Sequence, residues 1–465
     1  MRPALHRDVL VAAALIGALS GSMAQAQTSF YAEAAKPYKG VTIRVLDEVT
    51  PLQETMSKIV PDFEKETGIR VEYELLNHFE VISKGQADMV SGRGYYDAVM
   101  LHGMQYGPML DAKAVRPLDD LIANPKLSNP ALDTQDLIQR PYRSLAFSGG
   151  KQYSFINWNY NQVYWYRADL LTNTDERAAF KTKYGYDLAP ARTLDEMRDI
   201  AEFFTRKKGE KLGGETLSGD FYGIVLEGIK GGTTFGSLWN NLMKNYGGDI
   251  IDASGAPTFN RPENIEAMRM WAQLWKFAPP GTAEYSLVDV PTVMGNGIAA
   301  QSIAWSDFVL GIDAPGKSPL AGKFGYAAMP VKKGLEAGRS AETEPSGTVI
   351  SAASKNPEAT FIFLQWLVDR DRQQKLIAAL GGGVPIRTSS WNLPQIKDSA
   401  NPTLFGAMRE TLAISTAKPK MPKFFEVYDA MSTIAQEVGL GRNTPEQAAK
   451  TGQEQMIRLC GRTCL

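Results

Sequence analysis

The sequence predicts an α/β protein of two lobes that are joined by strands. The chain has 465 residues, which is too long for one hydrophobic core and suits two domains. Residues 41–75 read as strand, helix and strand, the βαβ unit of a parallel sheet. Residues 153–171 begin as a strand rich in aromatic and amide side chains, which would need buried partners inside a core. We therefore interpret this strand as the first crossing between the lobes.

The first lobe alternates strands and helices. Residues 41–46 alternate as a strand, and a helix is predicted over residues 53–66 because its apolar positions recur at helical spacing before Gly68. Further strands are expected over residues 69–75 and 96–101. Polar groups at the strand ends are the candidate binding residues of this lobe: Glu48, Phe79 and Glu80 in the loop after His78, and His102. The alternative for each histidine is an ordinary, hydrogen-bonded polar residue.

Helices dominate after the crossing. Helical spacing predicts them over residues 194–207 and 235–246, from Asn260, and from Lys355. The helix that Asn260 caps has an apolar face that includes Trp271 and Trp275. We expect these two tryptophans in the core.

The N-terminus has the pattern of a secretory signal peptide. Arg2, His6 and Arg7 precede an apolar run over residues 9–19, and Ala24-Gln25-Ala26 supplies a cleavage signal. Cleavage after Ala26 and a periplasmic mature protein are therefore expected. No later apolar run reaches the roughly 18 residues that a membrane helix needs.

Two cysteines, Cys460 and Cys464, lie at the end of the chain. In an oxidising compartment the pair is expected to form a disulfide that closes a small loop. Two unpaired thiols are the alternative.

Charge and metal-ligand residues exclude several functions. The formal net charge is −1, which predicts no general attraction to nucleic acid. The mature chain keeps only His78 and His102, and no histidine or cysteine pair stands at ligand spacing, so no metal site and no cofactor are expected. Residues 311–318 match a phosphate-binding loop, but Pro319 disfavours the helix start that this motif requires.

Four stretches together resemble the extracellular solute-binding proteins of bacterial ABC importers, in particular the family 1 carbohydrate-binding group. Phe63-Glu-Lys-Glu-Thr-Gly-Ile-Arg-Val resembles the first helix-to-strand turn of that family, and Tyr96-Asp-Ala-Val-Met resembles its third strand. Residues 247–263 resemble the turn before a helix of the second lobe. Residues 354–367 resemble the helix after the return crossing.

This resemblance implies the periplasmic-binding-protein fold, in which each lobe holds a mainly parallel sheet flanked by helices and hinge strands join the lobes. It implies a monomer that captures a neutral carbohydrate or sugar alcohol, delivers it to a membrane permease and catalyses no reaction. The expected boundaries are a signal peptide over 1–26, a first lobe over 27–152, a crossing over 153–159, and a second lobe over 160–343. The return crossing and the rest of the first lobe follow over 344–386, and the second lobe ends the chain over 387–465.

Aromatic and amide side chains are the candidate sugar contacts. A sugar presents apolar C–H faces, which stack on aromatic rings, and hydroxyls, which pair with amides and carboxylates. For the three tryptophans among these candidates, Trp158, Trp239 and Trp305, burial in the core is the alternative. The crossing and the second lobe supply these candidates: Trp158, Asn159, Trp239, Trp305 and Asp307. Gly347 would let the backbone approach the ligand, and Arg387 would donate to hydroxyls or pair with a surface carboxylate.

Two other functions stay open at this point. A secreted hydrolase that acts on glycosides through a pair of carboxylates is one, since sequence gives no separations; the G-x-S-x-G elbow of a serine hydrolase is absent. A binding protein for another solute, such as polyamine, phosphate or iron, is the second.

Overall fold

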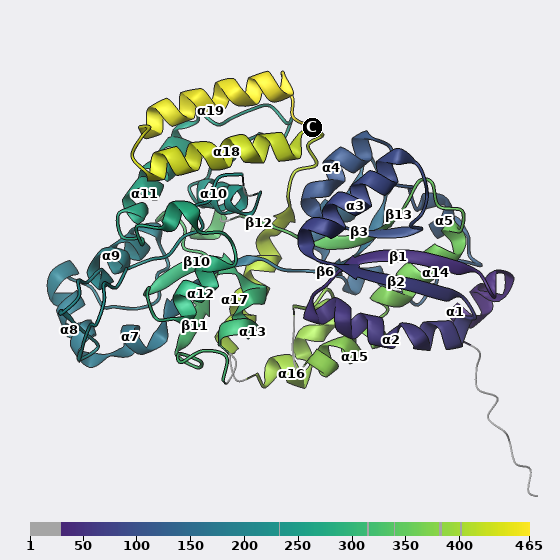
Figure 1. The fold of residues 1–465 in the computed structure, drawn as a ribbon, viewed down its shortest axis with the longest axis horizontal. Helices are drawn as coiled ribbons and strands as arrows, with labels where there is room; N and C mark the ends of the chain where they lie inside the picture. The colour runs from purple at the N-terminus through teal and green to yellow at the C-terminus, as the bar shows by residue number, and fades with distance from the viewer. Residues whose placement is uncertain (1–28, 232, 314–315, 339, 381–383, 400–401) are drawn as a thin grey trace, which may run out of the picture.

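The computed structural model describes residues 29–231, 233–313, 316–338, 340–380, 384–399 and 402–465. The predicted signal peptide and its cleavage after Ala26 lie outside the described residues. The described chain forms two α/β lobes, which stand side by side in Figure 1 with strands running between them. In this part of the chain no helix combines the length and the apolar character needed to cross a bilayer.

The first lobe is built on a five-stranded sheet in the order β2-β1-β3-β13-β6. The strands β2, β1 and β3 pair in parallel, and β13 runs antiparallel between β3 and β6. The sheet is therefore mainly parallel, as predicted. Its strands are β1 (Thr42–Glu48), β2 (Arg70–Leu76), β3 (Ala98–His102), β6 (Ser154–Trp158) and β13 (Ser346–Ile350).

Helices cover both faces of this sheet, and Figure 1 places α3 and α4 above it and α2 and α15 below it. Local sequence explains their ends. In α2, the Thr50 side chain accepts a hydrogen bond from the backbone of Gln53, and Gly68 ends the helix with a φ of 75°. The helices of this lobe are α1 (Phe30–Ala34), α2 (Pro51–Thr67), α3 (His78–Ser91), α4 (Gly103–Asp111), α5 (Asp119–Ala123), α6 (Gln139–Ala146), α14 (Pro357–Val368) and α15 (Arg370–Leu380).

The second lobe departs from the expectation of a mainly parallel sheet. Its sheet has the order β10-β7-β11, and both pairings are antiparallel. The central strand β7 follows the crossing directly, and its two partners come from well over one hundred residues later in the chain. No βαβ pattern therefore marks this sheet in the sequence. The strands are β7 (Gln162–Arg167), β10 (Gln301–Trp305) and β11 (Phe324–Ala327).

Helices form most of the second lobe. Trp271 lies in the core, as predicted, and its indole Nε1 donates to the carbonyl of Ala435 at 2.9 Å. The helices are α7 (Ala168–Thr172), α8 (Thr174–Tyr184), α9 (Leu194–Phe204), α10 (Thr233–Asn245), α11 (Pro262–Trp275), α12 (Asp289–Gly295), α13 (Val309–Ile312), α17 (Pro402–Ile414), α18 (Phe424–Gly439) and α19 (Pro445–Cys460). No helix starts at Lys317, because residues 316–320 form turns.

Short elements complete the chain. They are β4 (Phe147–Ser148), β5 (Lys151–Gln152), β8 (Lys211–Leu212), β9 (Glu215–Thr216), α16 (Pro394–Lys397) and the 3-10 turns η1 (Lys36–Tyr38), η2 (Thr134–Asp136), η3 (Thr282–Glu284), η4 (Ser306–Phe308), η5 (Glu336–Gly338) and η6 (Thr388–Asn392).

Three connections join the lobes. The first runs from β6 to β7, and the second runs from β12 (Ala341–Thr343), which pairs in parallel with β14 (Ser415–Ala417), to β13. The third connection begins later than the expected boundary at residue 387. Arg387 and Ser389 are still bonded to Asp136 of the first lobe, so the chain leaves only after η6.

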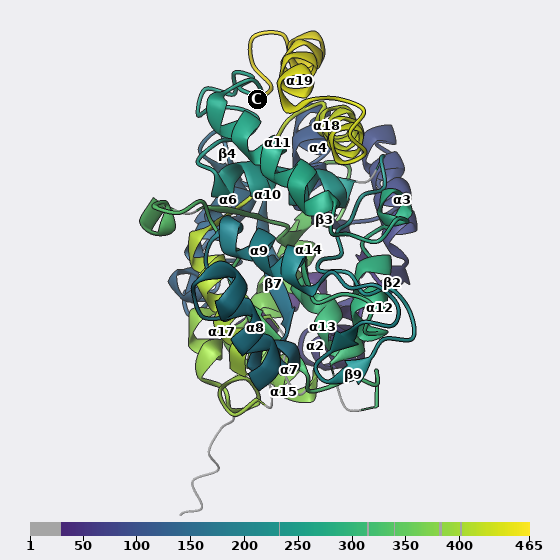
Figure 2. The ribbon, with the colours of Figure 1, turned by 90° about the vertical axis from the view of Figure 1, so that its left-hand side faces the viewer.

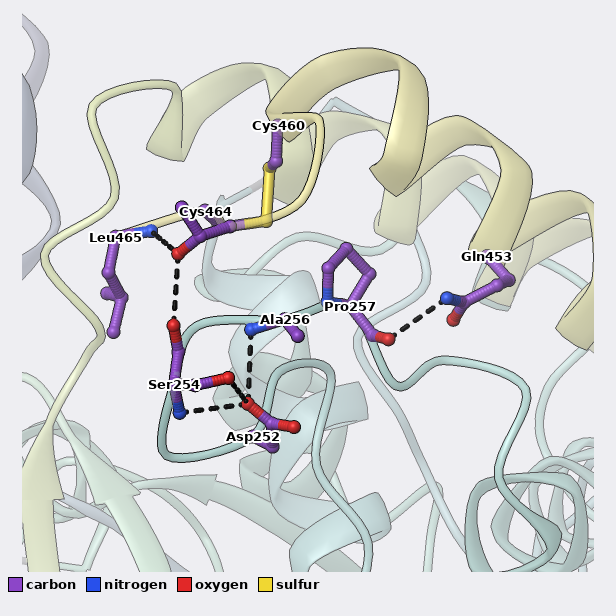
Figure 3. Close-up of a disulfide and its surroundings, with 9 residues drawn as sticks. Asp252, Ser254, Ala256, Pro257, Gln453, Cys460, Cys464 and Leu465 are labelled. Carbon is purple, nitrogen blue, oxygen red and sulfur yellow. Dashed lines mark hydrogen bonds between the residues drawn. A yellow bond between two sulfur atoms is a disulfide. The ribbon is translucent and has the colours of Figure 1, made fainter.

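The C-terminal tail docks on the second lobe. Cys460 and Cys464 form the predicted disulfide at the end of α19 (Figure 3). The backbone N–H of Cys464 donates to the carbonyl of Gly255 at 2.8 Å. Figure 2 shows α18 and α19 together at the top of the view.

Candidate functional site

A cavity of about 340 Å³ lies where the two lobes meet. The first lobe supplies the end of β1 and the start of α2, the crossing supplies Trp158, and the second lobe supplies η4 and α17. Helix α15 and Val384 close one side. The lining residues are Glu48, Val49, Thr50, Pro51, Leu52, Trp158, Ser306, Asp307, Phe308, Gln373, Ile377, Leu380, Val384, Leu404, Phe405 and Met408.

Three polar residues converge on the first-lobe side of the cavity. Glu48 ends β1, His102 ends β3, and His78 opens α3 directly after β2. The carboxyl ends of adjacent parallel strands meet at one edge of a sheet, which explains the convergence. His102 Nε2 lies 2.6 Å from Glu48 Oε2, and His78 Nδ1 lies 3.2 Å from the same oxygen.

These contacts keep Glu48 ionised. Burial alone would raise the pKa of its carboxyl group, but hydrogen bonds from His102 and His78 outweigh burial and lower the pKa to about 2. The other nitrogen of His102, Nδ1, lies 3.0 Å from Ser346 Oγ and 3.2 Å from Tyr160 Oη. Both ring nitrogens of His102 therefore have partners inside the protein.

Aromatic rings form the wall beside this polar group. The ring centroids of Trp158 and Tyr160 are 4.7 Å apart, and those of Tyr160 and Trp305 are 5.3 Å apart. Trp158 lines the cavity directly. Trp305 stands behind Tyr160 with 4% of its surface exposed, and its indole Nε1 has no hydrogen-bond partner among the described residues.

Asp307 adds a second carboxylate, from the opposite wall. It lines the cavity in η4, and its Oδ1 atom is buried without a hydrogen-bond partner in the described part of the chain. Burial raises the pKa of this carboxyl group to about 6. An unpaired buried oxygen is costly, so this atom is suited to accept a hydrogen bond from a ligand.

Several predicted residues lie elsewhere and serve the fold. Trp239 is buried in the core of the second lobe, where its ring centroid is 5.6 Å from that of Trp271. Asn159 donates to the carbonyl of Pro385 at 3.1 Å. Arg387 is fully buried in the first lobe, where it donates to the carbonyls of Leu132, Asp133 and Val368. None of these residues is among those that line the cavity.

Three more predicted contacts lie outside the cavity lining. Phe79 and Glu80 occupy the first turn of α3 and face solvent, with 78% of Phe79 exposed. Gly347 lies in β13, where a Cβ atom would come within 2.7 Å of the Phe155 carbonyl and of Tyr106 Oη. The glycine therefore permits close packing between strands and does not bring the backbone to the cavity.

Sequence reasoning missed the apolar side of the cavity. Helix α17 contributes Leu404, Phe405 and Met408, and α15 contributes Ile377 and Leu380. The sequence predicts a helix from Lys355, which reaches α15, but it predicts no element over the residues of α17. Only the fold brings both helices to the junction of the lobes.

Residues 48–374 match the family described as bacterial extracellular solute-binding protein. The chain belongs to this family. The match confirms the resemblance seen in the sequence, and it spans parts of both lobes and the cavity-lining residues from Glu48 to Gln373. Proteins of this family and those with similar structures are binding proteins.

Individual relatives agree with this assignment. A protein of Sinorhizobium fredii, named as a probable amino-acid ABC transporter periplasmic-binding protein, is 26% identical over 419 residues, which cover 89% of this chain and 88% of the relative. A solute-binding protein from Agrobacterium radiobacter, solved with ribitol, has a TM-score of 0.72 at 24% identity and covers 90% of this chain and 99% of that one. One from Agrobacterium vitis, solved with D-mannitol, has a TM-score of 0.68 at 23% identity, with 90% and 99% covered. The two structures establish the fold.

Proposed function

We propose that this solute-binding protein captures a small neutral carbohydrate or sugar alcohol in the cavity between its lobes and delivers it to an ABC permease. The observation that carries the proposal is the composition of the cavity wall. An indole ring, Trp158, stands beside two carboxylates, Glu48 and Asp307, that come from opposite lobes. Stacking surface and hydroxyl acceptors are what a polyol or sugar requires.

The volume of the cavity and the charge of its lining residues limit the classes of solute that fit. Small-molecule sites span roughly 300–1,000 Å³, so a cavity of about 340 Å³ suits a monosaccharide or a short sugar alcohol. Among the described residues that line it there is no lysine or arginine. An anion such as phosphate would find carboxylates and no counter-charge, which disfavours that class of solute.

The same argument weighs against an amino acid, which the name of the Sinorhizobium fredii relative suggests. An amino-acid zwitterion brings a carboxylate that needs a cation or several N–H donors. The nearby Lys418 is buried in an ion pair with Glu344, and its Nζ lies 6.0 Å from the Trp305 ring. Ribitol and D-mannitol, which the two solved structures hold, are neutral polyols and agree with the charge of this cavity.

Closure of the lobes is the proposed mechanism. A solute that contacts Glu48 on one lobe and Asp307 on the other stabilises the closed arrangement in proportion to its extra contacts there. The permease then recognises the closed form. We further propose that the mature protein starts after Ala26, works in the periplasm as a monomer and does not turn over its solute.

A thermal-shift screen tests this proposal. The mature protein is heated with polyols, mono-, di- and trisaccharides, amino acids, polyamines and phosphate. A ligand at 100 times its Kd adds about 2.7 kcal/mol, so a true solute raises the melting temperature clearly. We expect a short polyol or monosaccharide to do so. Stabilisation by an amino acid alone, or release of product from chromogenic glycosides, would contradict the proposal, and a polyamine hit would show that the two carboxylates select a cation.

A further inference from the structure

We propose that Glu48, His78 and His102 form a binding site for a divalent transition metal of the zinc class. The proposal does not depend on which solute the cavity takes. The described part of the chain holds two histidines, and the fold brings both to the same carboxylate from positions 24 residues apart in the sequence. The sequence shows no metal-ligand spacing because the three ligands come from three separate elements.

The ligand atoms lie close enough to share one ion. One ring nitrogen from each histidine and one carboxylate oxygen of Glu48 all lie within 4.8 Å of one another. Zinc binds nitrogen and oxygen at about 2.0–2.2 Å, so ligands of a tetrahedral ion stand roughly 3.3 Å apart. The 3.2 Å between His78 and Glu48 already fits, and the 2.6 Å between His102 and Glu48 needs to widen by less than 1 Å.

The surroundings of His102 suit a metal ligand. A histidine that binds metal through Nε2 carries its proton on Nδ1 and donates it to an outer partner. Nδ1 of His102 faces the hydroxyls of Ser346 and Tyr160, at 3.0 and 3.2 Å. Hydroxyls accept as well as donate, so Nε2 becomes free for a metal without leaving Nδ1 unpaired.

The charge balance and the open side of the site also favour a cation. Two histidines and one glutamate leave a fourth position of a tetrahedral ion unfilled, which is the pattern of zinc sites that bind an exogenous ligand. Glu48 lines the cavity, so the proposed site adjoins the solute space. The unpaired Oδ1 of Asp307 lines the same cavity and adds negative charge from the opposite wall.

Calorimetry with zinc chloride tests the site. The mature chain from residue 27, without a histidine tag and freed of metal by a chelator, keeps only His78 and His102 as imidazoles. We expect one zinc ion per chain, and loss of about tenfold or more in affinity in His78→Ala and in Glu48→Gln. His78 is 28% exposed at its side chain, so that variant should fold, which its melting curve checks. Glu54→Gln, an exposed carboxylate in α2, is the matched control and should bind like the wild type.

Two further measurements separate this site from unspecific binding. Cobalt should produce the visible absorption of a nitrogen- and oxygen-bound tetrahedral ion in the wild type and lose it in His78→Ala. Magnesium, which prefers an all-oxygen site, should not compete. Equal zinc affinity in the wild type, His78→Ala and Glu48→Gln, or no binding to the wild type, would overturn the proposal. A sugar screen run in chelator measures the proposed function separately, so failure of one is distinguishable from failure of the other.

Discussion

Lys418 and Glu344 form an ion pair that is buried at the hinge between the lobes. The two side chains are 1% and 3% exposed. Glu344 follows β12 on the return crossing and also accepts a hydrogen bond from the backbone of Met104 in the first lobe, at 2.9 Å. Lys418 follows β14, and its Nζ lies 5.6 Å from the Phe424 ring of the second lobe. One ion pair thus ties the return crossing and the C-terminal part of the chain to both lobes.

Removal of the lysine should destabilise the protein strongly. In Lys418→Met the buried Glu344 carboxylate loses its counter-charge, and breaking a buried pair in this way costs about 3–5 kcal/mol. Urea denaturation measures the change in the free energy of unfolding. The double variant with Glu344→Gln should recover part of the loss because no unpaired charge remains. If the single variant is as stable as the wild type, the pair does not hold the hinge.

Tryptophans should separate into two groups by their effect on binding. Trp158→Ala removes a ring from the cavity wall, and loss of stacking and apolar contact should cost roughly 2–4 kcal/mol, or about 30- to 1,000-fold in Kd for the solute found in the screen. Trp239→Phe, in the core of the second lobe, should lower the melting temperature and leave Kd unchanged. Titration followed by tryptophan emission measures both. Equal Kd values for Trp158→Ala and the wild type would show that Trp158 does not contact the solute.

Replacement of Trp305 should affect both solute binding and stability. Trp305 stands behind Tyr160 with little exposed surface, so Trp305→Ala should act on binding through the position of Tyr160 and Trp158 and also reduce stability. The sequence analysis expects a direct sugar contact for Trp305, with burial in the core as the alternative.

A structural feature of this chain is predictable from sequence where its signal is local. The end of α2 could be predicted because Gly68 acts within one turn, and Glu48 and His102 could be placed at one sheet edge because parallel strands fix that edge. Trp239 could not be told from Trp158, since both are aromatic residues beside asparagines and only packing between distant helices buries the first. The metal-ligand group and the wall formed by α17 likewise depend on contacts between elements far apart in sequence.

Lys420 should make stability depend on pH. Burial lowers the pKa of its amino group to about 8, below its ordinary value of 10.5. Between these values the unfolded chain holds a proton that the folded chain has released, so stability rises with pH across this window. Below the window both states are protonated, and the cost of burying the charged lysine no longer changes with pH. The stability of wild type relative to Lys420→Met should increase by on the order of 2 kcal/mol from pH 7.5 to 10. Urea denaturation at several pH values measures it, and the exposed Lys423→Met should show no such trend.

Arg387 should matter for stability and not for solute affinity. Its guanidinium donates to carbonyl groups of Leu132, Asp133 and Val368 inside the first lobe. Arg387→Met leaves these acceptors unpaired at about 1–3 kcal/mol for each group that stays buried without a partner. Thermal denaturation should show a large loss, whereas Arg140→Met, at an exposed position, should show little. If Arg387→Met is as stable as the wild type but loses solute binding, Arg387 belongs to the binding site and this assignment is wrong.

The disulfide at the tail should add modest stability and no affinity. Cys460 and Cys464 enclose a very short loop, for which the chain-entropy relation gives about 2 kcal/mol, less than the roughly 3 kcal/mol of a fifteen-residue loop. The tail is also held by hydrogen bonds, from the backbone of Cys464 to Gly255 and from the Thr463 hydroxyl to Ser254 at 3.1 Å, so part of the docking should survive without the bridge. Helix α19 supplies none of the residues that line the cavity.

Replacement of both cysteines by serine should therefore lower the free energy of unfolding by about 2 kcal/mol or less and leave Kd for the solute unchanged. Thiol titration of the exported, denatured and unreduced protein should find no free thiol. The wild type treated with reductant serves as the matched control, because it should lose the same stability as the double variant. Two titratable thiols in the exported protein would show that the bridge does not form. A decrease in the free energy of unfolding far above about 2 kcal/mol would show that the hydrogen bonds to Ser254 and Gly255 do not keep the tail docked without the bridge.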